Sequence, residues 1–371
     1  MRGSRCEPLE FLMTLPAPSV FIEGIALEIS WADRHRNLSE LIFDTTRRAI
    51  DDAGRGLAGI DSVVLAAHDL VDGRSLSSMV TGPPAGAYLR DEIRYGDDGA
   101  GAFAAAVTRI EAGESERSIV AAWGRASEHN VDAVSRVLFD PFFGRPFGLE
   151  ELHVSAMRAQ AWKRGAADGG DPAPASAARL AAVARNPRAL RLGGSRSNAS
   201  HPLAPEHLPL WADVVAAVVI SGRPNGVRVA GLGQGSEPYW IGDRHLLELG
   251  ALRRAAKLAL AEAGCRVEDI DVFELDGMTL YDEGLSLEAI GIAKSGEGLR
   301  ALTQDARCNP SGGSAAGYCA PAMGLTRIVE AVLQLRGDAG ANQVPRARRA
   351  LASGSSLVAA QTQTVVVLES A

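Results

Sequence analysis

Apolar residues recur along the chain with two spacings, one typical of buried strands and one typical of amphipathic helices. Short runs rich in apolar and β-branched residues predict strands over 20–29, 60–67, 118–123, 210–222, 227–232 and 270–275. Apolar positions three and four residues apart predict helices over 38–53, 100–112 and 246–263. Because strands and helices alternate, the pattern indicates an α/β fold.

The same pattern occurs twice. An acidic-Ala-Gly motif at 52–54, followed by Ile-Asp at 60–61, returns at one offset at 262–264 and 270–271. A third match, Thr-Arg-Ile, pairs residues 108–110 with residues 326–328. The simplest explanation is a tandem duplication of a strand–helix–strand–helix unit, because each unit buries one sheet face and needs its partner to cover the other. Chance matching of short, common motifs is the alternative.

Residues 140–209 separate the two repeats and are rich in Ala, Gly, Pro and Arg. This composition predicts an insertion, or lid, with one or two helices and flexible joints. We therefore expect an N-terminal half over 1–209, which includes the insertion, and a C-terminal half over 210–371. The arginines of the insertion are interpreted either as phosphate ligands or as part of a solvated surface helix: Arg179, Arg185, Arg188, Arg191 and Arg196.

Composition and charge argue against several classes of protein. With 46% hydrophobic and 22% charged residues, the chain of 371 residues is typical of a soluble globular protein. A net charge of −7 argues against a nucleic-acid surface, and no apolar run approaches the ~20 residues of a membrane helix. Glu7 and Glu10 interrupt the N-terminal apolar stretch, which makes a poor signal peptide, so we expect a cytoplasmic protein. The cysteines and histidines show no metal-ligand spacing, so no metal site is expected.

Gly231 and Gly233 imitate the start of a dinucleotide-binding loop. Ser236 stands where the third glycine of that fingerprint belongs, and no acidic residue follows at a clear ribose position. We expect a hairpin or a strand-end turn here instead.

A glycine-rich loop leads into the last long helix that apolar spacing predicts, with Leu325, Ile328 and Leu335 on one face. Backbone N–H groups of such loops approach a ligand closely, and a helix start favours negative charge. The order of residues resembles the C-terminal signature of the thiolase superfamily, N-x-x-G-G-x-x-x-x-G-H-P-x-G-x-x-G, at Asn309, Gly312, Gly313, Gly317 and Gly324. This resemblance implies that those five residues bind substrate.

The catalytic His of that signature is absent from this chain. Counting back from Gly324 places Tyr318 at its position, whereas counting forward from Gly313 places Cys319 there, because the loop is one residue short. Tyr318 would serve as an acid or a base, or would be a packed ring whose hydroxyl finds one partner. Cys319 would be a displaced nucleophile or an inert buried residue.

The other reactive positions of the superfamily are also replaced. The nucleophilic Cys falls on Gly96, and the following Asp97 and Asp98 would act as a base or cap the next helix. Asp276 replaces the His of the H-D-A-F motif found in sterol-carrier-type thiolases. It would act as an acid or a base if its pKa is raised, or be satisfied by neighbouring N–H groups. The second Cys falls on Ala352.

The resemblance covers roughly residues 20–137 and 210–371 and implies a thiolase-like α/β fold. Two tandem-duplicated βαβαβ halves would form a layered α-β-α-β-α core. It also implies action on acyl-CoA or carrier-bound thioesters, with CoA as substrate and no other cofactor. Because the Cys and His are missing, we expect Cys-independent acyl transfer or aldolase-like C–C bond chemistry, with Tyr318 and Tyr281 as acid and base. The alternative is a non-catalytic subunit that scaffolds or presents substrate.

Partners follow from the same resemblance. Thiolase-like proteins usually pair through an edge strand, so a homodimer is expected, and residues 118–123 are our candidate for that strand. A small OB-fold acyl-CoA-binding protein or an intact thiolase paralogue is the other expected partner. Neither nucleic acid nor a membrane span is expected.

Overall fold

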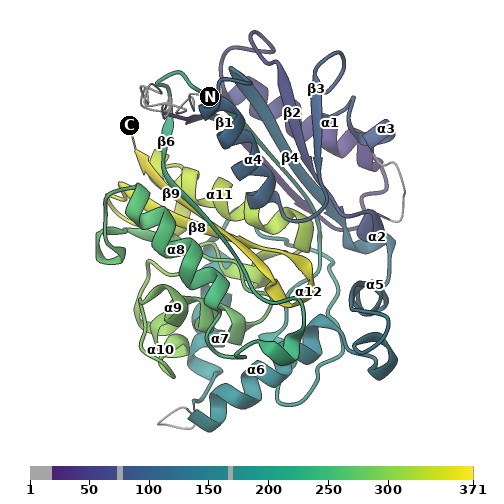
Figure 1. Cartoon of the computed structure of the whole chain (residues 1–371), viewed down its shortest axis with the longest axis vertical. Helices are drawn as coiled ribbons and strands as arrows, with labels where there is room; N and C mark the ends of the chain where they lie inside the picture. Colours follow the sequence, from purple (N-terminus) through teal and green to yellow (C-terminus); the bar gives the residue numbers. More distant parts are fainter. Residues whose placement is uncertain (1–18, 73–77, 166–169, 371) are drawn as a thin grey trace, which may run out of the picture.

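The computed structural model describes residues 19–72, 78–165 and 170–370 of the chain, so the expectation about the N-terminal stretch lies outside the described residues. Within them, nine strands form one sheet in the order β3-β2-β4-β5-β1-β6-β9-β8-β7. Figure 1 shows β3, β2 and β4 side by side at one end of this sheet. The strands are β1 (Phe21–Ser30), β2 (Ser62–Ala66), β3 (Asp91–Tyr95), β4 (Arg117–Arg125), β5 (Asp213–Ser221), β6 (Val227–Ser236), β7 (Val272–Glu274), β8 (Arg349–Ser355) and β9 (Thr362–Ser370).

Helices pack on both faces of this sheet. The long ones are α1 (Leu38–Asp52), α4 (Gly99–Glu111), α6 (Glu151–Gly165), α7 (Ala173–Arg185), α8 (Gly250–Glu262), α9 (Leu280–Ile290) and α11 (Ala320–Arg336). Shorter ones are α2 (Asp69–Asp72), α3 (Ser78–Thr81), α5 (Val131–Leu138), α10 (Gly298–Gln304) and α12 (Leu357–Ala360). None of the described helices is long and apolar enough to span a membrane.

The sheet consists of two half-sheets. Strands β3, β2, β4, β5 and β1 form the first, and β6, β9, β8 and β7 form the second. They meet where β1 pairs antiparallel with β6 over only two residues, Phe21 with Arg228 and Ile22 with Val227. The pairs β2–β3, β2–β4 and β7–β8 are parallel, whereas the other pairs are antiparallel. The division of the sheet therefore falls between β1 and β6, while the chain boundary at residue 210 stays a prediction.

Three hydrophobic clusters place the helices in layers. Leu41 and Ile42 of α1 pack on the outer face of the first half-sheet. Phe103 of α4 and Ile328 of α11 share one cluster with inward-facing residues of both half-sheets, so these two helices form the central layer. Leu252 of α8 belongs to a third cluster on the outer face of the second half-sheet. The expected α-β-α-β-α arrangement is confirmed, and it is that of thiolase-fold structures.

The strands and helices predicted from periodicity are present, with their ends shifted by a few residues. The insertion carries two helices, α6 and α7, as its composition predicts. The expectation that residues 118–123 form an edge strand is wrong, because β4 lies between β2 and β5 and is buried along its whole length. Among the described strands, β3 and β7 form the edges.

The turn expected at Gly231 is also wrong, because that residue lies within β6. Gly231, Gly233 and Gly235 face α8, and a Cβ on each would come within 2.4 Å of a backbone oxygen of that helix. These alternate glycines therefore let α8 pack closely on the strand.

Candidate functional site

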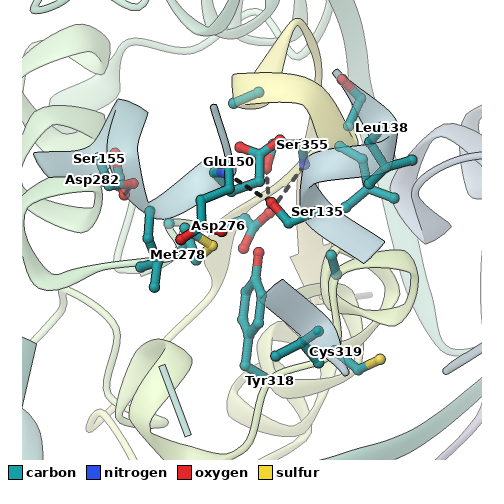
Figure 2. Close-up of a pocket in the computed structure, with 18 of the residues that line it drawn as sticks. Ser135, Leu138, Glu150, Ser155, Asp276, Met278, Asp282, Tyr318, Cys319 and Ser355 are labelled. Atoms are coloured by element: carbon teal, nitrogen blue, oxygen red, sulfur yellow. Dashed lines mark hydrogen bonds between the residues drawn. The ribbon is translucent and has the colours of Figure 1, made fainter. Parts of the chain in front are cut away.

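A cavity of about 70 Å³ lies where α11 begins, and segments from the whole length of the chain enclose it (Figure 2). Ser135 and Leu138 come from α5, while Ser155 and Arg158 come from α6 of the insertion. The second half adds the residues that follow β7, the residues before α11, the end of β8 and the start of α12: Asp276, Gly277, Met278, Tyr318, Cys319, Ser355 and Leu357. The cavity therefore lies at the meeting point of the insertion and both halves.

Two backbone hydrogen bonds hold the main chain of Tyr318 in place. Its N–H donates to the Leu210 carbonyl at 2.8 Å, and its carbonyl accepts from the Ala212 N–H at 3.0 Å. The ring is only 4% exposed and meets Trp211 edge-to-face, with ring centroids 5.2 Å apart. Figure 2 shows the hydroxyl directed into the cavity, towards Asp276 and Ser135. Burial, with the nearby carboxylate of Asp276, raises the pKa of Tyr318 well above its usual range, so the phenol keeps its proton at neutral pH.

Asp276 follows β7 and is held by two serines of β8. Its carboxylate accepts from the hydroxyl of Ser355 at 2.5 Å and from the Ser355 N–H at 3.2 Å. Its own N–H donates to the Ser353 hydroxyl at 3.0 Å. Burial raises the pKa of Asp276, while the hydrogen bond from Ser355 opposes that rise. A carboxyl group with a raised pKa is suited to accept or donate a proton near neutral pH.

Asp98 is the N-cap of α4, so the capping interpretation is confirmed for this residue. Its carboxylate accepts from the Ala100 N–H and, across the central layer, from the Gly324 N–H of α11, each at 2.9 Å. Burial, together with nearby Asp276 and Asp97, raises its pKa well above the usual range. Asp97 accepts from the Leu357 N–H at 3.2 Å, and burial raises its pKa to about 6. Both carboxylates lie behind the cavity lining, where they join α4 to its surroundings.

Cys319 is among the residues that line the cavity, but its thiol lies against the first half-sheet. A Cβ added to Gly124 of β4 would stand 2.3 Å from its sulfur, so the sulfur fills the space beside that glycine. In Figure 2 the sulfur is directed away from the Tyr318 hydroxyl. Tyr318, rather than Cys319, therefore presents its reactive atom to the cavity.

Tyr281 lies elsewhere. Its ring packs edge-to-face against Trp162 and His207, with centroids 5.8 and 5.4 Å away, and it does not belong to the described lining of the cavity. Burial raises its pKa to about 12. The structure therefore brings Tyr318 together with Asp276 and keeps Tyr281 apart from both.

The C-terminal part of the chain matches a known family. Residues 233–370 match the family model described as Thiolase C-terminal domain-like. Over 107 residues the chain is 36% identical to sterol carrier protein 2 of Bos taurus, a match that covers 27% of this chain and 20% of that protein. Over 109 residues it is 35% identical to acetyl-CoA acetyltransferase of Methanothermobacter thermautotrophicus, covering 27% and 28%. The chain thus spans about a fifth of the length of the sterol carrier proteins that it matches.

Solved structures extend the likeness in fold to almost the whole chain. The Ltp2-ChsH2(DUF35) aldolase superposes with a TM-score of 0.76 at 19% identity, over 95% of this chain and 98% of that one. Human mitochondrial 3-ketoacyl-CoA thiolase gives 0.70 at 14% identity, over 96% and 100%. A monomeric SCP2-thiolase like protein type 1 from Mycobacterium smegmatis gives 0.68 at 17% identity, over 95% and 77%.

The chain therefore has the thiolase fold, and its C-terminal part matches a thiolase family model.

In this thiolase-like protein, the residues of the signature loop before α11 make contacts with other parts of the protein. The Asn309 side chain accepts from the Leu275 N–H at 2.7 Å and donates to the Leu275 carbonyl at 3.2 Å. The four glycines of the signature allow close contacts with other parts of the protein: Gly312, Gly313, Gly317 and Gly324. None of these five residues belongs to the described lining of the cavity, so their role as substrate ligands stays a prediction.

The insertion of this thiolase-like protein is tied down by buried charge. Arg179 pairs with Glu283 at 3.1 Å, and Arg188 pairs with Glu330 at 2.6 Å. Arg191 donates to a backbone carbonyl of Asn186, and Arg196 donates to the Leu208 carbonyl at 2.8 Å. Arg185, at the end of α7, is exposed. Four of the five insertion arginines therefore hold protein groups, which neither the phosphate nor the solvated-helix interpretation expected.

Sequence reasoning missed the polar groups that the insertion adds to the cavity. The carboxylate of Glu151 accepts from the Ala359 N–H at 2.7 and 2.9 Å, and burial raises its pKa to about 7. Ser155 donates to Asp282 at 2.6 Å, and Arg158 pairs with the same carboxylate at 3.1 Å. Glu151, Ser155 and Arg158 stand at helical spacing on one face of α6, a signal that could have found them. No group of three or more His, Cys, Asp or Glu residues among the described residues could hold a metal ion.

Proposed function

We propose that this thiolase-fold protein cleaves or forms a C–C bond beside a CoA thioester without a Cys nucleophile. One observation carries the proposal: the buried hydroxyl of Tyr318 and the carboxyl group of Asp276 enter one cavity, where α11 begins. Helix α11 has 17 residues, and the partial positive charge at its N-terminus favours an enolate formed there. The similarity in fold to a protein described as an aldolase supports the same chemistry.

The two groups have opposite roles in this proposal. For cleavage of a 3-hydroxyacyl thioester, Asp276 takes the proton of the 3-hydroxyl group, and that O–H electron pair becomes the carbonyl bond of the released ketone or aldehyde. The bond between C2 and C3 breaks, and its electron pair forms the thioester enolate. Tyr318, which stays protonated, donates a hydrogen bond to the enolate oxygen and then supplies the proton to C2. Asp276 returns its proton to Tyr318, so the products are a carbonyl compound and a shortened acyl-CoA.

Two substitutions at adjacent positions test this assignment. The purified protein is incubated with a 3-hydroxyacyl-CoA, and the shortened acyl-CoA is measured by mass spectrometry. Tyr318→Phe should lower the rate by about 10²–10⁴, the range for loss of a general acid. Cys319→Ala should stay within about threefold of the parent protein, because the thiol faces Gly124. An acyl adduct on Cys319, or full activity of Tyr318→Phe, contradicts the proposal.

A second candidate function is a non-catalytic subunit that scaffolds or presents substrate. It is favoured by the replacement of both superfamily cysteines, at Gly96 and Ala352. The partner of such a subunit would be an intact thiolase or a small OB-fold protein. Such a subunit would show no turnover alone with any 3-hydroxyacyl-CoA or 3-ketoacyl-CoA, yet would raise the melting temperature of that partner.

Assembly and location complete the proposal. We propose a homodimer that pairs through β3, the edge of the first half-sheet, next to the exposed apolar residues Tyr88 and Leu89. Replacing Ile93 of β3 with Pro should then yield a monomer in light scattering. CoA or acyl-CoA is proposed as substrate with no other cofactor, and the cytoplasm as the location.

A further inference from the structure

A second hollow, the aromatic cleft, lies between the start of the insertion and the loop that follows β6. Its volume is about 380 Å³, several times that of the cavity at Tyr318. Aromatic and aliphatic side chains form most of its lining: Phe139, Phe143, Phe147, Tyr239, Trp240 and Ile241. The two sides of the cleft meet where Phe143 and Trp240 pack edge-to-face, with ring centroids 5.2 Å apart.

The aromatic cleft offers a ligand few hydrogen-bonding groups. Its one acidic side chain, Asp140, is turned to its own loop and accepts from the N–H groups of Phe142, Phe143 and Gly144 at 2.8, 3.0 and 2.8 Å. Apart from the Tyr239 hydroxyl and the Trp240 indole N–H, a polar ligand would find few partners there to replace its hydration. The lining therefore selects a hydrocarbon group.

The aromatic rings of the cleft are open to solvent although its floor is packed. Phe143 is 60% exposed and Phe147 is 88% exposed. Beneath them, Phe139, Val154 and Ala359 form a small buried cluster that fixes the shape of the floor. Isolated exposed apolar residues are common, but a contiguous group of aromatic rings over a rigid floor is typical of a binding site.

Neighbouring residues line the aromatic cleft and the cavity in turn. At the end of α5, Leu138 lines the cavity and Phe139 lines the cleft. At α12, Leu357 lines the cavity and Val358 lines the cleft. The two hollows are thus lined by adjacent residues of the chain at two places. Leu138 and Leu357 are only half-buried, so they stand at the rim of the cavity rather than in the core.

We infer that the aromatic cleft binds the bulky hydrocarbon part of the acyl group whose reacting carbons lie between Tyr318 and Asp276. This inference rests on the proposed function. The cavity of about 70 Å³ is smaller than the cleft across its rim, which supplies further space for a larger acyl group. The site therefore selects thioesters by the size of a hydrocarbon group that carries no hydrogen-bonding substituents.

Calorimetry with two thioesters tests the inference. The full chain should bind adamantylacetyl-CoA at least about tenfold more tightly than acetyl-CoA, because the cleft removes the apolar surface of the adamantyl group from water. In the double variant Phe143→Gln/Trp240→Gln the difference should fall below about threefold, with the affinity for acetyl-CoA unchanged. The matched control is Phe43→Gln on α1, another exposed phenylalanine outside the cleft, which should keep the full difference.

The outcomes separate this inference from the proposed function. An undiminished difference in the double variant overturns the inference while leaving the chemistry at Tyr318 intact. If neither thioester binds, adamantylacetic acid without CoA is titrated. Binding that the double variant loses supports the cleft and contradicts the proposed function. No binding in either titration contradicts both and leaves the aromatic surface to a protein partner.

Discussion

Strands β1 and β6 each contain a shift in pairing register beside a glycine. Each of these glycines packs against its covering helix at the same distance from the end of that helix. The register of β1 shifts before Gly24, and that of β6 shifts before Gly231. A Cβ on Gly24 would lie 2.1 Å from the Ala49 oxygen of α1, and a Cβ on Gly231 would lie 2.1 Å from the Ala259 oxygen of α8. The two halves of the molecule therefore share their scaffold down to single backbone contacts.

The central helices of the two halves differ in what they bury. The Thr-Arg-Ile repeat places Arg109 on α4 and Arg327 on α11. The Arg109 side chain is 17% exposed and pairs with Asp91 at the sheet edge. The Arg327 side chain is 2% exposed, pairs with Glu274 at 3.1 Å and donates to Ser311 at 2.7 Å.

The insertion is anchored mainly to the second half. The charged residues that anchor the insertion, Arg179 and Arg188, find their partners Glu283 and Glu330 in the second half. In the first half, by contrast, the face of α4 within the central cluster is formed by small and apolar side chains such as Phe103. The two halves therefore share a scaffold, while the ion pairs that anchor the insertion are made with the second half.

The largest expected difference in stability is between the two repeated arginines. Arg327→Met should cost about 3–5 kcal/mol of unfolding free energy, because Glu274 would stay buried without its ion pair. Arg109→Met should cost less than about 1 kcal/mol, because its pair lies at the surface. Urea unfolding of both variants measures the two values. Equal costs would mean that the halves do not differ as described.

The second prediction compares two carboxylates near the cavity, one from each half. Asp276→Asn should lower the rate of C–C cleavage by about 10²–10⁴, the range for loss of a general base. Asp97→Asn should lower it by less than about tenfold, because that group lies behind the cavity lining. Steady-state assays of both variants decide the point, and a larger loss at Asp97 would place the base in the first half.

The pH dependence sharpens this second prediction. Burial raises the pKa of Asp276, so the rising limb of the parent protein's rate should lie at higher pH than an ordinary aspartate would give. That limb should disappear in Asp276→Asn and persist in Asp97→Asn. A rising limb that survives in Asp276→Asn would assign the base to another group.

Periodicity predicted the scaffold because most of its strands and helices bury one regular face. It missed β3, whose sequence Asp91–Tyr95 carries charged residues and lies half-exposed at the edge. The opposite error placed an edge strand at 118–123. That run is apolar on both of its faces, and helices cover both faces there, which is typical of an interior strand.

Sequence reasoning found part of the site for a similar reason. Tyr318 and Asp276 stand at fixed distances from motifs of the second half, so spacing alone located them. Ser135 and Glu151 come from segments without a motif, and tertiary contacts bring them to the cavity, where the Glu151 N–H donates to Ser135 at 2.8 Å. The signature glycines illustrate the limit of motifs, since Gly313 contacts Glu283 rather than the cavity.

The third prediction tests the shared scaffold. Gly24→Ala and Gly231→Ala should each destabilise the protein by about 1–3 kcal/mol, because each new methyl group would meet helix backbone that must move. The two costs should agree within about 1 kcal/mol if the halves are equivalent at this contact. Gly54→Ala is not a suitable control because its φ is positive, whereas Gly96→Ala meets open space and should have little effect. Unequal costs in urea unfolding would show that the two half-sheets tolerate strain differently.

The last prediction concerns Glu151, which ties the insertion to α12. Burial raises the pKa of its carboxyl group from 4.5 to about 7 in the folded protein. A raised folded-state pKa gives stability that is full below the unfolded value and is lost as pH rises through the folded value. The parent protein should therefore lose about 3 kcal/mol between pH 4.5 and pH 8 relative to Glu151→Gln, since one pKa unit is about 1.4 kcal/mol.

Measuring both proteins at both pH values removes any constant effect of the substitution. Urea unfolding of the parent protein and of Glu151→Gln at pH 4.5 and pH 8 gives four free energies, and the change in their difference reports Glu151 alone. Asp97 is the carboxyl group of the first half chosen for comparison, and burial raises its pKa only to about 6. The difference in unfolding free energy between the parent protein and Asp97→Asn should therefore reach its final value at lower pH. Parallel pH courses of the parent protein and Glu151→Gln would mean that Glu151 is ionised in the folded state. The hold of the insertion on α12 would then be a charged one, like the pairs that Arg179 and Arg188 make with the second half.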